Sequence, residues 1–91
     1  MNIPQLKDID IAIQIYYKYP EITAKEIQLL FVKNSKSTIN KLKKLAQKQM
    51  IEDNINTLSI NKVNTSSAYK AWGIDIKDLE NRRNKLKKLG L

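Results

Sequence analysis

The apolar residues of the first twenty positions recur at intervals of three and four, which is the spacing of one helix face. Pro4 suits the first position of a helix, and Pro20 disfavours helical angles in the residue before it. We therefore expect a first helix that starts near Pro4 and ends before Pro20. Its apolar face consists of Leu6, Ile9, Ile13 and Tyr16, widened by Ile11 and Ile15.

The stretch "TAKE" at Thr23–Glu26 predicts the start of a second, short helix. Thr at the cap with Glu three residues later forms a capping box, in which each side chain bonds the other residue's backbone N–H. We expect this helix to end near residues 33–34, where Asn34 tolerates the left-handed conformation. Its buried residues are Ile27, Leu30 and Phe31.

Ser35 is placed to cap a third helix with the sequence "KSTINKLKKLAQKQM". At 100° per residue, the apolar residues fall on one side of this helix and the polar residues on the other. The apolar stripe consists of Ile39, Leu42, Leu45 and Ala46. The polar face consists of Ser37, Asn40, Lys41, Lys44 and Lys48.

The next segments predict a weak strand and then a second pair of helices. "LSIN", within residues 50–63, alternates as a short strand would. Asn64 or Thr65 can cap a helix through Trp72, and Gly73 can take the positive φ that ends it. Asp75 can cap the last helix, with Asp78 in its first turn, where the helix dipole favours acids.

The order helix, short helix, turn, basic helix in "ITAKEIQLLFVKNSKSTINKLKKL" resembles the helix-turn-helix and winged-helix superfamily of DNA-binding proteins, in particular small bacterial or phage and mobile-element regulators. "AYKAWGID" resembles a second helix-turn-helix. The resemblance implies one mainly α domain across residues 1–91. In it, a three-helix core at about 4–49 precedes a short β wing at about 50–63 and a second helical pair at about 65–89.

The net charge of +8 is concentrated in two segments. Residues 33–48 hold six Lys and no acid, and residues 77–91 hold six basic residues and two acids, whereas the rest of the chain is slightly acidic. Like charges on one helix repel each other. One interpretation is that the lysines only keep the surface soluble. A polyanionic partner explains their clustering better, and double-stranded DNA is the partner we expect.

An α-helix fits the major groove, where Asn pairs with adenine and Lys reaches guanine acceptors. For contacts with base edges we expect Ser37, Asn40 and Lys41. For contacts with phosphates, which position the helix, we expect Lys33, Lys36, Lys44 and Lys48. The corresponding set on the last helix consists of Lys77, Asn81, Asn84, Lys85 and Lys88.

The hexamer "NKLKKL" occurs twice, at residues 40–45 and 84–89. The alignment places Leu42 on Leu86 and Leu45 on Leu89, which predicts matching buried positions and suggests a duplication. Two interpretations of residues 64–91 stay open. They form a second DNA-reading unit, or they form a packing and dimerisation element with a heptad-like seam: Tyr69, Trp72, Ile76, Leu79 and Leu86.

The chain contains no His and no Cys, which excludes the usual zinc ligand sets and most hydrolytic triads. We expect no enzyme activity, no cofactor and no metal. No apolar run approaches the ~20 residues of a membrane helix, so we expect a cytoplasmic protein. The expected function is sequence-specific binding of double-stranded DNA, by a transcriptional regulator or by an accessory factor of a mobile element or phage. Such a protein can act as a homodimer. The alternatives are a helical dimerisation or adaptor module and a DNA-binding subunit of phage packaging.

Overall fold

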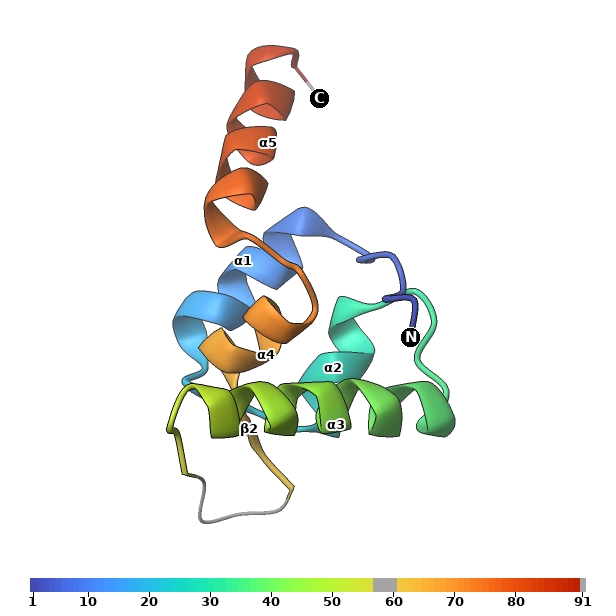
Figure 1. Cartoon of the computed structure of the whole chain (residues 1–91). Helices are drawn as coiled ribbons and strands as arrows, with labels where there is room; N and C mark the ends of the chain where they lie inside the picture. The colour runs from blue at the N-terminus through green and yellow to red at the C-terminus, as the bar shows by residue number, and fades with distance from the viewer. Residues whose placement is uncertain (57–60, 91) are drawn as a thin grey trace.

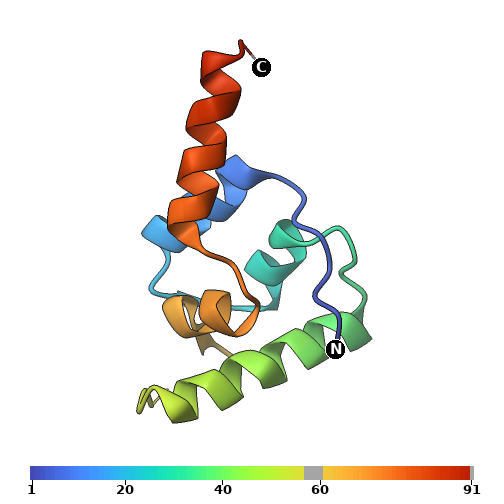
Figure 2. The same cartoon turned by 45° about the horizontal axis from the view of Figure 1, so that its top comes forward.

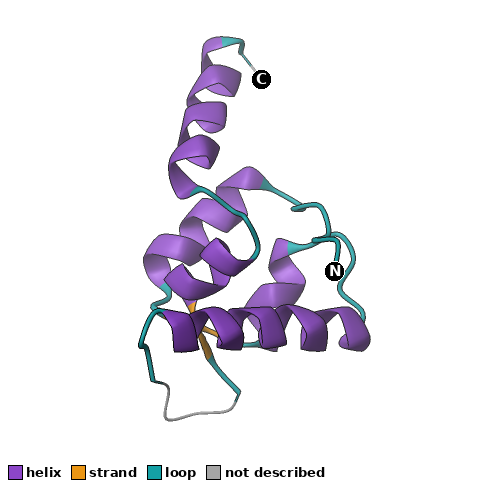
Figure 3. Ribbon diagram, in the orientation of Figure 1, coloured by secondary structure: helices purple, strands orange, loops and turns teal. Residues whose placement is uncertain are grey.

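The computed structural model describes residues 1–56 and 61–90. These residues form five helices and one two-stranded antiparallel sheet (Figures 1 and 3). In chain order the elements are α1 Ile9–Lys18, β1 Glu21–Ile22, α2 Ala24–Leu30, α3 Lys36–Glu52, β2 Val63–Asn64, α4 Thr65–Ala71 and α5 Ile76–Lys88. The mainly helical class predicted from the sequence is confirmed. None of the helices in the described ranges is long and apolar enough to cross a membrane.

Helix α1 begins directly after Asp8, and the predicted start near Pro4 is wrong. The Asp8 carboxylate accepts hydrogen bonds from the backbone N–H of Asp10 and Ile11, at 2.7 and 3.3 Å, and thereby caps the helix. The helix ends at Lys18, so the predicted end before the following proline is confirmed.

The N-terminal residues are extended because they pair with the end of α2. The Lys7 N–H donates to the Leu30 carbonyl (2.8 Å), and the Val32 N–H donates to the Gln5 carbonyl (2.9 Å). This pairing also accounts for the length of α2. It ends at Leu30 rather than near residues 33–34, and the next residue is extended with φ −115° and ψ 145°. Long-range backbone pairing here overrides the local preference for helix.

The capping box of α2 is confirmed, because the Thr23 N–H donates to Glu26 Oε1 at 2.8 Å and the Thr23 hydroxyl caps the helix. The three residues predicted to be buried are buried: Ile27, Leu30 and Phe31.

A strand occurs at the end of the segment where the sequence predicts a wing. In β2, Val63 pairs with Ile22 of β1, and Asn64 pairs with Glu21. The strand thus pairs with the segment between α1 and α2, not with a neighbour in a hairpin. Of the predicted strand "LSIN", residues 58–60 lie outside the described part of the chain.

Helices α4 and α5 are two separate helices, as predicted. The Asn64 side chain caps α4 by accepting from the Ser67 N–H (2.9 Å), and Asp75 caps α5. Between them, Gly73 has φ 71°. Its N–H donates to the Lys70 carbonyl, and the next N–H donates back to the carbonyl of residue 69, which is the Schellman arrangement. The chain therefore does not continue from α4 into α5 as one helix.

Tyr69 of α4 and Trp72, the residue directly after the helix, join α1 and α3. Tyr69 and Trp72 are 1% and 3% exposed. The Tyr69 hydroxyl donates to the Ala12 carbonyl of α1 (2.6 Å), and the Trp72 indole N–H donates to the Leu42 carbonyl of α3 (2.9 Å). Burial raises the pKa of Tyr69, so its hydroxyl stays a donor. Both rings lie in the core of their own chain, so these two residues of the heptad-like seam pack within the molecule and are not available to a dimer surface.

Helices α3 and α5 lie at opposite ends of the molecule. Figures 1 and 2 show α3 along one edge, with α2 and α4 on its inner side, and α5 projecting from the opposite end beside α1. The principal extents of the chain are 43 × 27 × 21 Å. The two basic helices therefore do not form one continuous surface.

Candidate nucleic-acid interface

Helix α3 presents its polar face to solvent. Ser35 caps it, accepting from the Thr38 N–H at 3.3 Å, as predicted. The 17 residues make a rod about 25 Å long. On its inner side Ile39, Leu42, Ala46 and Met50 are buried. On its outer side every residue predicted to face away from the core is exposed: Ser37, Asn40, Lys41, Lys44 and Lys48.

The lysines of residues 33–48 have no acidic partner among the residues that the structure describes. Lys33 and Lys36 are exposed, as are the three lysines of the outer face, and Lys43 is half-buried. Within the described ranges, the ion pairs involve Lys70, Arg82 and Arg83, and none involves a lysine of residues 33–48. The positive charge on this side of α3 is therefore not neutralised by the part of the protein that the structure describes.

The turn between α2 and α3 is fixed by one side chain. The Asn34 amide donates to the carbonyls of Gln28 (3.1 Å) and Phe31 (3.4 Å). Among the described residues, the non-glycine residue with a positive φ is Asn54 (57°). Asn34 therefore does not adopt the left-handed conformation that its residue type allows. Asn34 orients the start of α3 through its amide, not through an unusual backbone.

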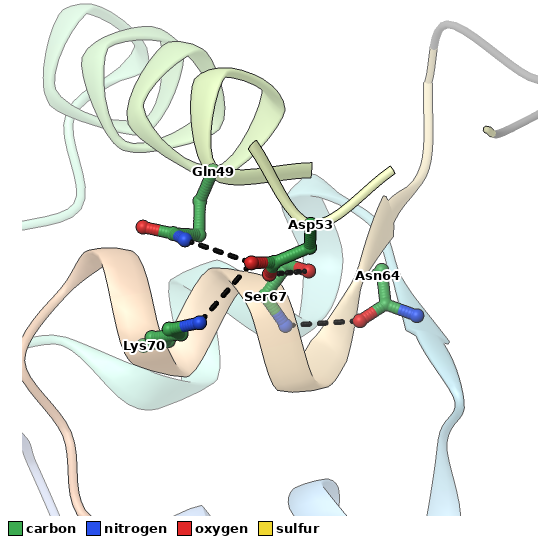
Figure 4. Close-up of polar contacts among 5 residues, drawn as sticks. All are labelled: Gln49, Asp53, Asn64, Ser67 and Lys70. Atoms are coloured by element: carbon green, nitrogen blue, oxygen red, sulfur yellow. Dashed lines mark hydrogen bonds and ion pairs between the residues drawn. The ribbon is translucent and has the colours of Figure 1, made fainter. Parts of the chain in front are cut away.

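The C-terminal end of α3 is held by a polar cluster around Asp53 (Figure 4). Its carboxylate accepts from the Ser67 hydroxyl (2.8 Å), the Gln49 amide (3.0 Å) and the Lys70 ammonium (3.1 Å). The hydrogen bonds from Ser67, Gln49 and Lys70, in that order, hold the pKa of Asp53 below its usual value. The cluster fastens α3 to α4, so the outer face of α3 has a rigid support.

Sequence reasoning missed this cluster. The spacing of Gln49 and Asp53, four residues apart at the end of a helix, was an available signal. The contact with Ser67 was not, because it depends on how α4 packs against α3.

The second predicted set is exposed but lies elsewhere. Lys77, Asn81, Asn84, Lys85 and Lys88 are all exposed on α5. Their helix packs against α1, at the end of the molecule opposite to α3 (Figure 1). The structure therefore brings together the predicted base and phosphate contacts of α3, but it does not bring the α5 set to them.

The predicted equivalence of buried positions in the two hexamers is wrong. Leu42 is 0% exposed, whereas Leu86 is 41% exposed; Leu45 packs against the core, whereas Leu89 is 73% exposed. The physical reason is that α3 has elements on its whole inner side, whereas the second half of α5 extends past α1.

The described residues contain no group of three or more acidic, His or Cys side chains that could hold a metal ion.

The described part of the chain forms a mainly helical domain of five helices and a small sheet, with a basic face on α3. Comparison with protein families, curated proteins and solved structures finds no match. The resemblance to helix-turn-helix proteins accordingly stays a prediction from the sequence.

Proposed function

We propose that the protein binds double-stranded DNA through the outer face of α3, as a transcriptional regulator or an accessory factor of a mobile element or phage. The observation that carries the proposal is an exposed face of Ser, Asn and Lys side chains on a braced helix, whose lysines form no ion pair with the acids of the described residues. An α-helix of this diameter fits the major groove of B-DNA, which is about 12 Å wide.

The residues of this face have different roles. Ser37, Asn40 and Lys41 lie in the first turns of α3 and are free to reach base edges, where the amide of Asn40 can pair with adenine through two hydrogen bonds. The lysines that flank them neutralise phosphates and fix the register of the helix: Lys33, Lys36, Lys44 and Lys48.

Selection from a random duplex library followed by fluorescence anisotropy tests the proposal. Contacts with about four phosphates predict that the logarithm of the affinity falls with the logarithm of the salt concentration with a slope of about −4. A slope near zero, or no binding at low salt, would refute DNA binding by this face.

Two substitutions separate the roles. Lys44→Ala should weaken binding to all duplexes by a similar factor and reduce the magnitude of the salt slope by about 1. Asn40→Ala should spare random duplex and lose about 1–3 kcal/mol of discrimination at one base pair of the selected site. The matched control is Lys18→Ala, which removes the same charge from α1, a helix that packs on α2 and α5, and should leave both affinities unchanged. Equal effects of Lys44→Ala and Lys18→Ala would contradict the assignment.

A further inference from the structure

The end of α5 carries a second concentration of charge that DNA binding by α3 does not use. We define the α5 tip as Lys85, Lys87 and Lys88, which are all exposed. In the described residues none of them forms an ion pair. The charge of the tip is therefore available to an external anion.

The acids of α5 do not neutralise the tip. Asp78 pairs with Arg82 at 3.0 Å, and Glu80 accepts a hydrogen bond from Tyr17 of α1. Arg83, just before the tip, faces Asp10 at 4.0 Å. All three contacts lie before residue 84, and the contacts to Tyr17 and Asp10 hold α5 against α1. The sequence from residue 84 onward contains no acidic side chain.

The tip cannot contact the duplex that lies on α3. The outer face of α3 points away from α2 and α4, and α5 projects from the other end of a body 43 Å long (Figures 1 and 2). A straight duplex along α3 would leave the tip on the far side of the protein. Any phosphate at the tip must belong to a different duplex.

Charge and the arrangement of side chains favour DNA over other partners of the tip. Two tips would repel each other, which disfavours pairing with a second copy. Binding to an anionic membrane needs an unbroken apolar face. On a helical projection Lys85 lies only about 40° from Leu89, and Arg82 lies between Leu89 and Leu86, so cations interrupt the exposed leucines at this end of the helix.

We propose that the α5 tip binds the phosphates of a second DNA duplex, so that one protein molecule bridges two duplexes. The proposal rests on the function proposed for α3. It assigns to the second basic helix a contact without sequence preference, because lysines that reach phosphates read no base.

A bead assay tests the bridging. One duplex of about 16 base pairs is immobilised, and retention of a second, fluorescent duplex is measured as the protein is added at low salt. Such a duplex is about 54 Å long and cannot wrap around a body of this size. Affinity for a single duplex is measured in parallel by anisotropy, and folding of each variant by circular dichroism.

Two triple variants remove the same charge from opposite ends of the molecule. The tip variant, Lys85→Gln with Lys87→Gln and Lys88→Gln, should keep its affinity for a single duplex within about threefold and lose at least about tenfold in retention. The α3 variant, Lys41→Gln with Lys44→Gln and Lys48→Gln, should lose single-duplex binding and retention together. An α3 variant that binds like the wild type refutes the proposed function itself.

Other outcomes overturn the bridging alone. If α3 governs binding but the tip variant bridges as well as the wild type, the tip has no role; light scattering at twice 10.6 kDa would then assign bridging to a dimer. If the tip variant weakens single-duplex binding as much as the α3 variant does, both surfaces share one duplex. Tip-dependent sedimentation with phosphatidylserine vesicles, without tip-dependent bridging, would identify a membrane contact instead.

Discussion

Helices α3 and α5 contain the same six letters, "NKLKKL", and place them in different surroundings. In α3 the first leucine, Leu42, is 0% exposed; in α5 its counterpart, Leu86, is 41% exposed. The pattern of apolar residues predicts which side of a helix can be buried. Whether that side is buried depends on how many elements pack against it.

The neighbours of the two helices account for the difference. Helix α3 packs against α4, α2 and β2, whereas α5 packs against α1. The buried residue of α5 is Leu79, near its start, at 5% exposed. The same sequence thus forms part of the core in one helix and a projecting basic end in the other.

The largest expected effect comes from truncating the two equivalent leucines. Leu42→Ala leaves a cavity in a filled core and should lower the free energy of unfolding by about 2–5 kcal/mol. Leu86→Ala removes a side chain that keeps much of its contact with water and should cost less than about 1 kcal/mol. Denaturant unfolding followed by circular dichroism measures both. Equal losses would show that the end of α5 is covered in solution.

The glycines that end α4 and α5 give a second comparison, with a smaller effect. Gly73 and Gly90 have φ of 71° and 75°, and a Cβ at either position meets no atom within 4 Å. Gly73→Ala should cost about 1–2 kcal/mol through backbone strain alone, because the chain must continue from there into α5. Gly90→Ala should cost less than about 0.5 kcal/mol, since the last turn of α5 can unwind. A Gly90→Ala loss that matches the Gly73→Ala loss in the same unfolding assay would mean that this turn is fixed.

Much of the fold was accessible from the sequence, because local signals specify it. The caps at Ser35, Thr23 and Asp75 lie where side-chain chemistry predicts them, and so does the glycine that ends α4. The sequence predicts helix boundaries wrongly where contacts with distant segments of the chain determine them. The start of α1 and the end of α2 depend on backbone pairing between residues 5–7 and 30–32, which no local pattern reveals.

The candidate interface was likewise predictable where local sequence determines it and unpredictable where long-range packing does. The exposed face of α3 could be predicted because a helix of known phase fixes which residues face outward. The location of α5 relative to α3 could not, because it depends on the packing of α4 and α1 between them. The repeated hexamer suggested equivalent roles, but the fold places the two copies at opposite ends.

The smallest expected effects concern the polar contacts that hold each helix, and they have opposite pH dependence. Asp53 fastens the end of α3, and its pKa is held below the usual value by Ser67, Gln49 and Lys70. A lowered pKa in the folded state stabilises the protein above the unfolded value of about 3.9 and loses this contribution as pH falls through the folded value. In the Asp53→Asn variant, the free energy of unfolding should therefore fall less steeply than in the wild type as the pH is lowered below about 4.

The contact that holds α5 should weaken in alkali instead. The hydrogen bond from Tyr17 to Glu80 raises the pKa of Tyr17, with some burial adding to it. A raised pKa in the folded state stabilises the protein below the unfolded value of about 10 and loses this contribution as pH rises through the folded value. Lysines titrate in the same range. The denaturant midpoints of the wild type and of the Tyr17→Phe variant are therefore measured across pH, and the difference between them is compared. A difference that stays constant through this range would show that the phenol does not hold α5 to α1.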